Sequence, residues 1–421
     1  MSSLLLKTKA LINVIVYKWR CVQLENKVCC STDSKSKTVR IKAKVKKTNQ
    51  LDSLPSIENN KSCCCSGNEK CSSNPITQYS KNDHWIIGEL ETDVGIVPQV
   101  STQLVFKDTI GTWKTRWGIG RMDYKVAPGI YAIGTPDKDS NVLVTANYKL
   151  TFDTLRKELE GLNVWVLVLD TKGINVWCAA GKGTFGTAEL INRISKTKLF
   201  SIVSHRTLIL PQLGAPGVRA HEVTKSTGFR IIYGPVRAND IQEFITSGMK
   251  ANEEMRTVKF NMMDRLVLTP MELVATFKIS LMIFGILFLL NLFIVNPFGV
   301  IDFYAYVGAI ITGCVLTPVL LPWIPGRAFA WKGWLLGLLW TLVVVLLNGG
   351  IATPSFGIIK ELGYLLVLPS ISAFYAMNFT GSSTYTSFSG VLREMRKAIP
   401  VIIITIGLGI LLLLVNGFIK F

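Results

Sequence analysis

The sequence predicts an α/β domain of the Rossmann-like kind, followed by an all-α transmembrane domain with five helices. Three observations predict this division: a basic N-terminal stretch with little apolar periodicity, alternating strand-like and helix-like patterns in the middle, and five long apolar stretches at the end. We expect a disordered, basic, Cys-rich tail at residues 1–83, the α/β domain at 84–270 and the transmembrane domain at 271–421.

The N-terminal tail is basic, since residues 1–50 hold 12 Lys and Arg against 2 Asp and Glu in a chain of net charge +18. Such a tail is attracted to anionic lipid or to nucleic acid, but no nucleic-acid-binding motif accompanies it, and we expect no nucleic-acid partner. Its apolar segment at residues 4–23 is interrupted by Lys and Arg and is followed by no clear cleavage site. This pattern indicates an amphipathic or disordered arm and not a signal peptide.

Seven of the nine cysteines lie in this tail, and one lies in an apolar stretch. The tail spacing departs from the Cys-x2-Cys-x2-Cys pattern of ferredoxin clusters, which favours a reduced linker over an iron–sulfur site. The α/β domain keeps Cys178 alone, which indicates a reducing compartment because the domain offers no disulfide partner. The other eight are Cys21, Cys29, Cys30, Cys63, Cys64, Cys65, Cys71 and Cys314.

Continuous apolar runs in the middle of the chain predict strands, and the stretches between them predict helices. Runs of this kind are typical of strands buried on both faces, so we expect a parallel sheet. Ligands of such sheets bind at the carboxyl ends of the strands. The predicted strands are 142–145, 164–169, 208–210 and 229–233, and the predicted helices are 150–162, 216–224 and 238–247. The candidate ligand loops are 145–147, 171–182, 204–205, 212–216 and 234–235.

Each of the five C-terminal apolar stretches approaches the roughly 20 residues that cross a bilayer. They are residues 273–295, 302–321, 329–348, 362–379 and 398–417. With the α/β domain in the cytoplasm, the inner loops carry Arg327, Lys332, Arg393, Arg396 and Lys397, and the outer side carries Lys360 and Lys420. This asymmetry satisfies the positive-inside rule. We therefore expect a multi-pass protein of the cell (inner) membrane, with its N-terminus and α/β domain cytoplasmic.

Cys178 is the most informative residue of the α/β domain. It lies where a predicted strand gives way to a predicted helix, with Trp177 before it and Ala179, Ala180 and Gly181 after it. A helix N-terminus favours the thiolate, which is the form that binds metals. The small residues beside the thiol leave room for a large, flat metal cofactor.

Two nucleotide-binding motifs fail at this loop. A P-loop needs Gly five residues before Gly181 and Ser or Thr after Lys182, but those positions hold Val176 and Gly183. Residues 181–186 match G-x-G-x-x-G, but they begin well beyond the end of the strand, and no acidic residue follows at the position that would hold the ribose. A nucleotide-binding enzyme is therefore disfavoured.

Four long segments resemble the HgcA family of corrinoid-dependent, mercury-methylating membrane proteins. They are residues 173–185 (GINVWCAAGKGTF), 205–217 (HRTLILPQLGAPG), 233–238 (YGPVRA) and 378–385 (NFTGSSTY). The resemblance covers about residues 85–421, and the Cys-rich tail departs from it. The α/β domain is also similar to the corrinoid-binding domain of the corrinoid iron–sulfur protein of acetogenesis, a family without this cysteine signature or membrane domain.

The resemblance implies a cobalamin-type corrinoid in its base-off form. Cys178 would be the catalytic residue and the metal ligand, as the lower axial ligand of cobalt. A thiolate there donates charge and would help the methyl group leave. Lys182 would steady the thiolate or meet the cofactor; a solvated lysine is the alternative. The implied cofactor-binding residues are Asn175, Val176, Trp177, Cys178, Ala179, Ala180, Gly181, Lys182, Ser204, Gln212, Leu213, Gly214, Ala215 and Gly234.

The resemblance further implies transfer of a methyl group from cobalt to inorganic Hg(II), which forms methylmercury. The implied partners are HgcB, a ferredoxin-type protein with two 4Fe-4S clusters that reduces cobalt, a methyl donor of the methyl-tetrahydrofolate type, Hg(II) and membrane lipid. An anaerobic host is implied as well. The alternatives are a corrinoid carrier or membrane sensor without transferase activity, and a methyltransferase with a different native acceptor.

Overall fold

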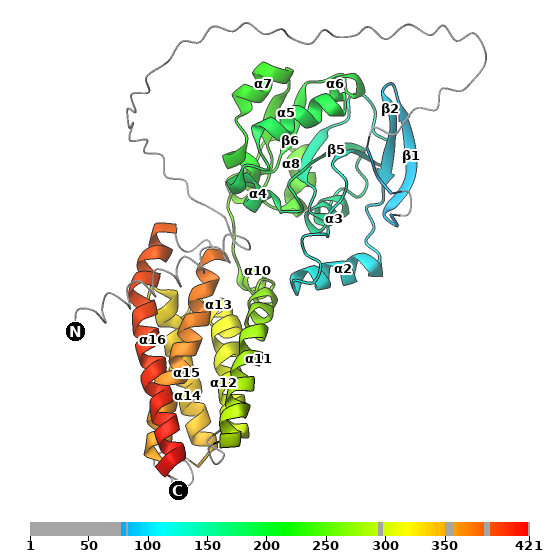
Figure 1. The fold of residues 1–421 in the computed structure, drawn as a ribbon. Coiled ribbons are helices and arrows are strands. Elements are labelled where there is room, and N and C mark those ends of the chain that lie inside the picture. Colours follow the sequence, from blue (N-terminus) through cyan, green and yellow to red (C-terminus); the bar gives the residue numbers. More distant parts are fainter. Residues whose placement is uncertain (1–76, 81–82, 294–297, 350–356, 383–387, 420–421) are drawn as a thin grey trace, which may run out of the picture.

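The computed structural model describes residues 77–80, 83–293, 298–349, 357–382 and 388–419 (Figure 1). They form an α/β domain and, after it in the chain, a bundle of long helices. This architecture confirms the predicted fold class of both parts. The prediction of a disordered tail falls almost wholly on residues 1–76, which lie outside the described residues.

A seven-stranded mixed sheet forms the centre of the α/β domain, in the order β1-β2-β3-β5-β4-β6-β7. The four strands β5, β4, β6 and β7 are parallel, as expected. The sheet as a whole is mixed, because β3 runs antiparallel to β5 and β1 runs antiparallel to β2. The strands are β1 (Ile86–Thr92), β2 (Gly95–Val100), β3 (Gly129–Ile133), β4 (Val142–Ala146), β5 (Val164–Leu169), β6 (Thr207–Leu210) and β7 (Arg230–Tyr233).

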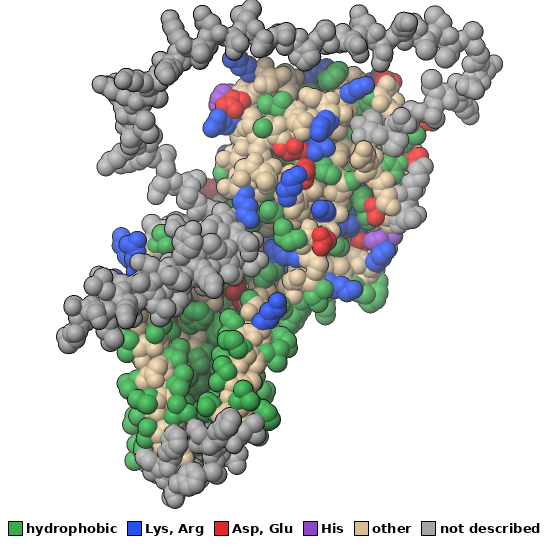
Figure 2. Space-filling view, in the orientation of Figure 1, with side chains coloured by type: hydrophobic (Ala, Val, Ile, Leu, Met, Phe, Trp, Pro, Cys, Tyr) green, Lys and Arg blue, Asp and Glu red, His purple; other side chains and the backbone are tan. Residues whose placement is uncertain are grey.

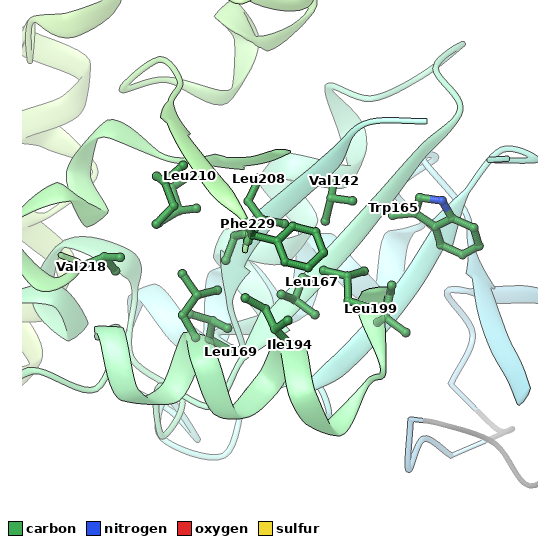
Figure 3. Close-up of a cluster of buried hydrophobic side chains, with 14 of the residues drawn as sticks. Val142, Trp165, Leu167, Leu169, Ile194, Leu199, Leu208, Leu210, Val218 and Phe229 are labelled. Atoms are coloured by element: carbon green, nitrogen blue, oxygen red, sulfur yellow. The ribbon is translucent and has the colours of Figure 1, made fainter. Parts of the chain in front are cut away.

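Helices cover both faces of this sheet, which explains why β3, β4 and β5 are buried along their whole lengths. On one face, Phe152 of α3 and Phe244 of α8 join a core with Tyr131 and Val166. On the other face, Figure 3 shows Leu167, Leu169, Leu208 and Leu210 meeting Ile194 of α5 and Phe229. The helices around the sheet are α2 (Phe106–Arg116), α3 (Lys149–Lys157), α4 (Val176–Lys182), α5 (Thr187–Lys196), α6 (Leu199–Ile202), α7 (Ala220–Thr227) and α8 (Ile241–Thr246).

Two predicted helices begin later than expected, each after a short 3-10 turn. The predicted helix 216–224 divides into η1 (Gln212–Gly217) and α7, because the Pro216-Gly217 pair does not continue a regular helix. The predicted helix 238–247 divides into η2 (Ala238–Asp240) and α8. Helix α3 ends at Lys157, several residues before its predicted end at 162.

The described part of the chain holds five helices long and apolar enough to cross a membrane, which matches the five predicted stretches. Apolar side chains cover the outside of this bundle (Figure 2). Gly333 and Gly337 let two of these helices pack closely, since a Cβ at either position would clash with the facing helix. The bundle consists of α11 (Thr269–Phe293), α12 (Val300–Ile311), η3 (Thr312–Leu316), α13 (Thr317–Val319), α14 (Phe329–Leu347), α15 (Ile358–Asn378), η4 (Phe379–Ser382) and α16 (Phe388–Ile419).

Two short helices join the domain to the bundle, α9 (Glu253–Arg256) and α10 (Met262–Leu266). Arg237 of the domain pairs with Asp264 of α10 at 2.6 Å. Arg265 of α10 donates to the backbone oxygen of Val319 at 2.9 Å, which ties α10 to the bundle.

Candidate functional site

The carboxyl ends of β4 and β5 lie where the order of the strands changes direction. The chain passes from β4 through α3 to β5 on one side, and then crosses β4 to reach β6 on the other side. In α/β sheets such a crossing point opens a crevice that binds ligands. A pocket of about 320 Å³ lies there, lined by Lys125, Val126, Ala127, Pro128, Asn147 and Asp170.

Asn147, the residue after β4, organises the loop that follows β5. Its side-chain oxygen accepts hydrogen bonds from the backbone N–H and hydroxyl of Thr171, at 3.1 and 2.8 Å, and from the N–H of Gly173 at 3.0 Å. Asn147 and Thr171 are both fully buried. The loop that leads to α4 is therefore held by a side chain from the neighbouring strand.

Gly173 gives this loop its sharp turn. Its φ of 72° lies in the left-handed region, and a Cβ at this position would lie 2.8 Å from the backbone oxygen of Met122. Only glycine fits both the conformation and the close approach. The turn brings the segment before β3 against the start of α4.

Helix α4 presents Cys178 in its first turn. The side chain of Asn175 caps the helix by accepting from the backbone N–H of Cys178 at 2.9 Å. Gly183 ends the helix with a φ of 79°. Both ends of this seven-residue helix are therefore specified by the sequence, and Cys178 has a fixed position on it.

The two faces of α4 differ in burial. Val176, Ala179 and Ala180 point into the core of the domain. Cys178 is half-buried, whereas Gly181 and Lys182, one turn further on, are exposed. The side chains of Ala179 and Ala180 are turned away from the exposed face. Gly181, three residues after Cys178, lies on the same side of α4 and carries no side chain.

The η1 turn supports α4 from behind. A Cβ at Gly217 would lie 2.1 Å from the backbone oxygen of Phe185 and 3.0 Å from the Cα of Ala180. A Cβ at Gly214 would lie 2.5 Å from the ring of Phe185. These glycines thus let η1 touch α4 and the residues after it. Gln212, Leu213 and Ala215 are half-buried in the same turn.

Gly234 follows the carboxyl end of β7. The sequence predicts the ligand site at the carboxyl ends of the strands. Gly234 is buried, and its N–H donates to the backbone oxygen of Leu210 at 2.7 Å. Its position agrees with the prediction that the loops after β6 and β7 share one edge with α4.

Ser204 lies at the opposite edge, and its predicted place at the carboxyl end of a strand is wrong. It precedes β6, and its backbone N–H donates to the oxygen of Lys138, which precedes β4. The neighbouring His205 contacts the backbone oxygen of Ser140 at 2.9 Å. Because both residues close the amino ends of β4 and β6, the structure does not bring Ser204 together with Cys178.

Cys178 shares its electrostatic surroundings with three residues that the sequence did not point to. The pKa of Tyr148 lies above its ordinary value, chiefly because the side chain is buried. The guanidinium groups of Arg121 and Arg116 act to lower this pKa, and Cys178 acts to raise it. Arg121 lies over the Tyr148 ring at 5.9 Å from its centroid. These residues come from two segments, the stretch 116–121 and the start of α3, so no local pattern could have revealed them. Asn147, in contrast, carries a sequence signal, because it directly follows a predicted strand.

The donor set of the domain suits a metal that brings most of its own ligands. In the described ranges, no group of three or more His, Cys, Asp or Glu side chains could hold a metal ion. Cys178 offers one soft sulfur donor on an otherwise open helix face. A macrocycle that surrounds its metal needs only an axial ligand, and this arrangement of residues fits that need.

Comparison with known proteins places the α/β domain among related sequences. Residues 115–245 match the family model described as CO dehydrogenase/acetyl-CoA synthase delta subunit. The acetyl-CoA decarbonylase/synthase complex subunit gamma of Methanopyrus kandleri is 33% identical over 127 residues, which are 30% of this chain and 27% of that protein. The same subunit of Methanocaldococcus jannaschii is 34% identical over 127 residues, 30% of this chain and 26% of that protein.

The corrinoid/iron-sulfur protein large subunit of Moorella thermoacetica is 28% identical over 127 residues, 30% of this chain and 28% of that protein. This chain thus matches about a quarter of the length of these relatives. The family match begins at the end of α2, includes α4 and ends before the five long helices. Residues 115–245 are therefore similar to the delta-subunit family, and about 30% of the chain is similar to subunits of acetyl-CoA decarbonylase/synthase complexes and of a corrinoid/iron–sulfur protein.

Proposed function

We propose that this chain is a membrane-anchored corrinoid methyltransferase that passes a methyl group from cobalt to inorganic Hg(II). The observation that supports this proposal most directly is the position of Cys178. It is half-buried on the open face of α4, in a chain similar to a corrinoid protein subunit. The five long apolar helices that follow the domain support a membrane anchor. The four segments that resemble the HgcA family support mercury as the acceptor.

Cys178 would hold the cofactor as the lower axial ligand of its metal. When bound, the corrinoid supplies cobalt as the carrier of the methyl group. As an anionic thiolate, Cys178 would donate more charge to the metal than a neutral imidazole would. Asn175 keeps the thiol in place through its bond to the Cys178 N–H. Trp177, the half-buried residue before Cys178 in the chain, would limit the access of water.

The other residues that the resemblance implies fall into two groups: those that would contact the cofactor and those that would support the helix and loops around it. Gly181 and Lys182 are exposed on α4 and would contact the cofactor. Gln212, Leu213 and Ala215 of η1 would approach it from the next strand end. Val176, Ala179, Ala180, Gly214 and Gly234 are buried and would position the helix and loops without direct contact. A ferredoxin-type reductant and a methyl-tetrahydrofolate-type donor complete the proposed reaction.

The axial-ligand role is tested by the absorption spectrum of the full chain, purified anaerobically and supplied with cobalamin. We expect a base-off corrinoid spectrum in the wild type and a different spectrum in Cys178→Ala. Cys314→Ala is the matched control, because Cys314 is buried in the helical bundle. An unchanged spectrum in Cys178→Ala would show that Cys178 is not a ligand of the metal.

A second candidate is a corrinoid carrier that serves a protein partner or another methyl acceptor. The names of the relatives favour it, because each is a subunit of a larger assembly. An anaerobic assay with Hg(II), the methyl donor and the ferredoxin-type reductant separates the two candidates. Methylmercury formed by the wild type and lost in Cys178→Ala supports the methyltransferase, whereas a normal corrinoid spectrum without methylmercury supports the carrier.

A further inference from the structure

Helix α2 exposes its apolar side instead of burying it. Four large side chains at positions i, i+4, i+7 and i+11 form one stripe, here called the α2 stripe. A surface helix of a globular protein normally turns such a stripe to the core. The α2 stripe consists of Phe106 (77% exposed), Ile110 (38%), Trp113 (67%) and Trp117 (44%).

The opposite face of α2 is polar and is the one that docks on the domain. Asp108 and Thr115 are fully buried, and a Cβ at Gly111 would clash with Tyr124. Asp108 pairs with Arg156 at 2.7 Å and with Lys149 at 3.1 Å, both of them buried. The orientation of α2 is therefore fixed by a buried ionic cluster, and this cluster forces the α2 stripe outward.

The segment after α2 lies against the first turns of α11. Arg121 contacts the sulfur of Met271 at 3.1 Å, and a Cβ at Gly118 would lie 3.9 Å from the Val274 side chain. Figure 1 shows α2 on the underside of the α/β domain, near α10 and across the direction of the bundle helices. The exposed Ile119 and Met122 continue the apolar surface toward α11.

The length of α11 places this contact at the edge of a bilayer. Its 25 residues extend about 37 Å at about 1.5 Å per residue, against about 30 Å of hydrocarbon. Roughly five residues of this length therefore exceed the hydrocarbon core. The acidic Glu272 in the first turn places this excess at the start of the helix. Met271 and Val274, which touch the segment after α2, lie at this end. The α2 stripe is thus near the level of the lipid headgroups.

The amino-acid composition of α2 is typical of a helix at the level of the lipid headgroups. Trp is enriched at the boundary between lipid and water, and interfacial helices combine Trp and Phe on one side with Lys and Arg beside them. Lys107 and Lys114 are exposed along the α2 stripe. The one acidic residue of α2 is the buried Asp108, so the exposed surface of the helix is cationic and apolar.

We propose that α2 is an interfacial helix that lies on the bilayer crossed by the bundle, with the α2 stripe in the lipid and Lys107 and Lys114 at anionic headgroups. The α/β domain then has a second attachment to the membrane besides the chain connection through α10. This attachment limits rotation of the domain about α10 and holds the carboxyl edge of the sheet at a fixed height above the lipid.

The test uses the full chain in nanodiscs that contain phosphatidylcholine and phosphatidylglycerol. Fluorescence of the wild type is compared with that of the double variant Trp113→Phe and Trp117→Phe, and the difference reports these two tryptophans. We expect lipids brominated near the headgroup to remove most of this difference signal, and lipids brominated near the chain ends to remove less. Trp165→Phe is the control, because Trp165 is buried in β5 and its signal should not respond to brominated lipid.

A difference signal that brominated lipid leaves intact and that iodide in solution quenches would overturn the proposal. That result would show the α2 stripe open to water or to a soluble partner. The charge-reversal variant Lys107→Glu and Lys114→Glu supplies a second measurement. It should reduce the lipid quenching in anionic nanodiscs and leave it unchanged in neutral ones; equal quenching of wild type and variant in anionic nanodiscs would exclude the headgroup role of the lysines.

Discussion

Two asparagines hold the two ends of the segment that presents Cys178. Asn147 fixes the turn after β5 from the neighbouring strand, and Asn175 caps α4 beneath the cysteine. Neither asparagine touches the open face of α4, so both act by positioning. The sequence alone predicts Cys178 and its helix, because the signal is local. It does not predict Tyr148 or Arg121 as neighbours, because folding brings them there from other segments.

Replacing Asn147 with Ala should destabilise the loop before α4. The variant leaves the buried N–H groups of Thr171 and Gly173 without their acceptor, at a cost of about 2 to 4 kcal/mol. Hydrogen exchange followed by mass spectrometry should show faster exchange in the peptide that covers residues 171–175. Asn239→Ala, at an exposed position, is the control and should leave that peptide unchanged. Equal exchange in Asn147→Ala and wild type would show that other contacts hold the loop.

Replacing Asn175 with Ala should loosen the first turn of α4. Loss of an N-cap side chain costs about 1 kcal/mol. We expect the thiol of Cys178 to react faster with a small alkylating reagent, because the residue leaves its half-buried position more often. The rate is measured on the Cys178 peptide by mass spectrometry, and Asn175→Asp, which keeps the acceptor, should restore the slow rate. Similar rates in all three proteins would contradict the capping role.

The docking of α2 depends on the charge of Asp108. Burial alone would raise the pKa of this carboxyl, but the Lys149 ammonium and hydrogen bonds from His84, Lys149 and the Val105 backbone lower it from 3.8 to about 2. Because the folded-state pKa is the lower one, ionised Asp108 stabilises the fold. This contribution is complete above about pH 4 and is lost as the pH falls through about 2.

Thermal unfolding of the full chain in detergent should therefore show a loss of stability in that acidic range. In Asp108→Asn this part of the pH dependence should disappear. The variant should also be less stable at neutral pH by about 3 kcal/mol, since Arg156 and Lys149 lose a buried partner. An Asp108→Asn protein with the acid sensitivity of the wild type would assign that sensitivity to other groups.

Among the elements, the sequence predicted the parallel strands β4, β5, β6 and β7, but it did not predict β1, β2 and β3 on the other side of the sheet. The strands β4 and β5 are continuous apolar runs, and their predicted bounds agree with the structure to within a residue. In contrast, β1 alternates between half-buried and exposed residues, and β3 pairs in the antiparallel direction through a partner distant in the chain. Pairing direction depends on tertiary contacts, so a local pattern does not contain it.

The contact between η1 and α4 has an element-scale consequence. Gly217→Val should push α4 from its place, because a Cβ there meets the backbone of Phe185 and Ala180, and overpacking of this kind costs about 1 to 3 kcal/mol. We expect weaker corrinoid binding although Cys178 is intact, measured by titration of the absorption spectrum. Gly299→Ala is the control, since no atom lies within 4 Å of its Cβ. Wild-type affinity in Gly217→Val would show that η1 does not set the position of α4.

At the scale of the molecule, the order of the long helices decides which connections lie at the same end of the bundle. The first long helix, α11, leads away from the α/β domain, and the other four alternate in direction (Figure 1). The connection between α13 and α14 therefore returns to the side of the domain, and the C-terminal end of α16 lies on the far side. Arg327, Lys332, Arg393 and Arg396 lie toward the domain, whereas Lys360 lies toward the far end. Lys420, the other predicted outer charge, lies outside the described residues.

This charge asymmetry predicts a cytoplasmic α/β domain and a C-terminus across the membrane. In a bacterial expression host, alkaline phosphatase fused to the C-terminus should be active, because it folds only outside the cytoplasm, and a fluorescent protein at the same place should stay dark. Fusions after Arg327 should show the reverse pattern. Changing Arg393, Arg396 and Lys397 to Glu should weaken the bias and lower the phosphatase signal of the C-terminal fusion. A fluorescent C-terminal fusion in the unaltered chain would place the α/β domain, and with it Cys178, outside the cytoplasm.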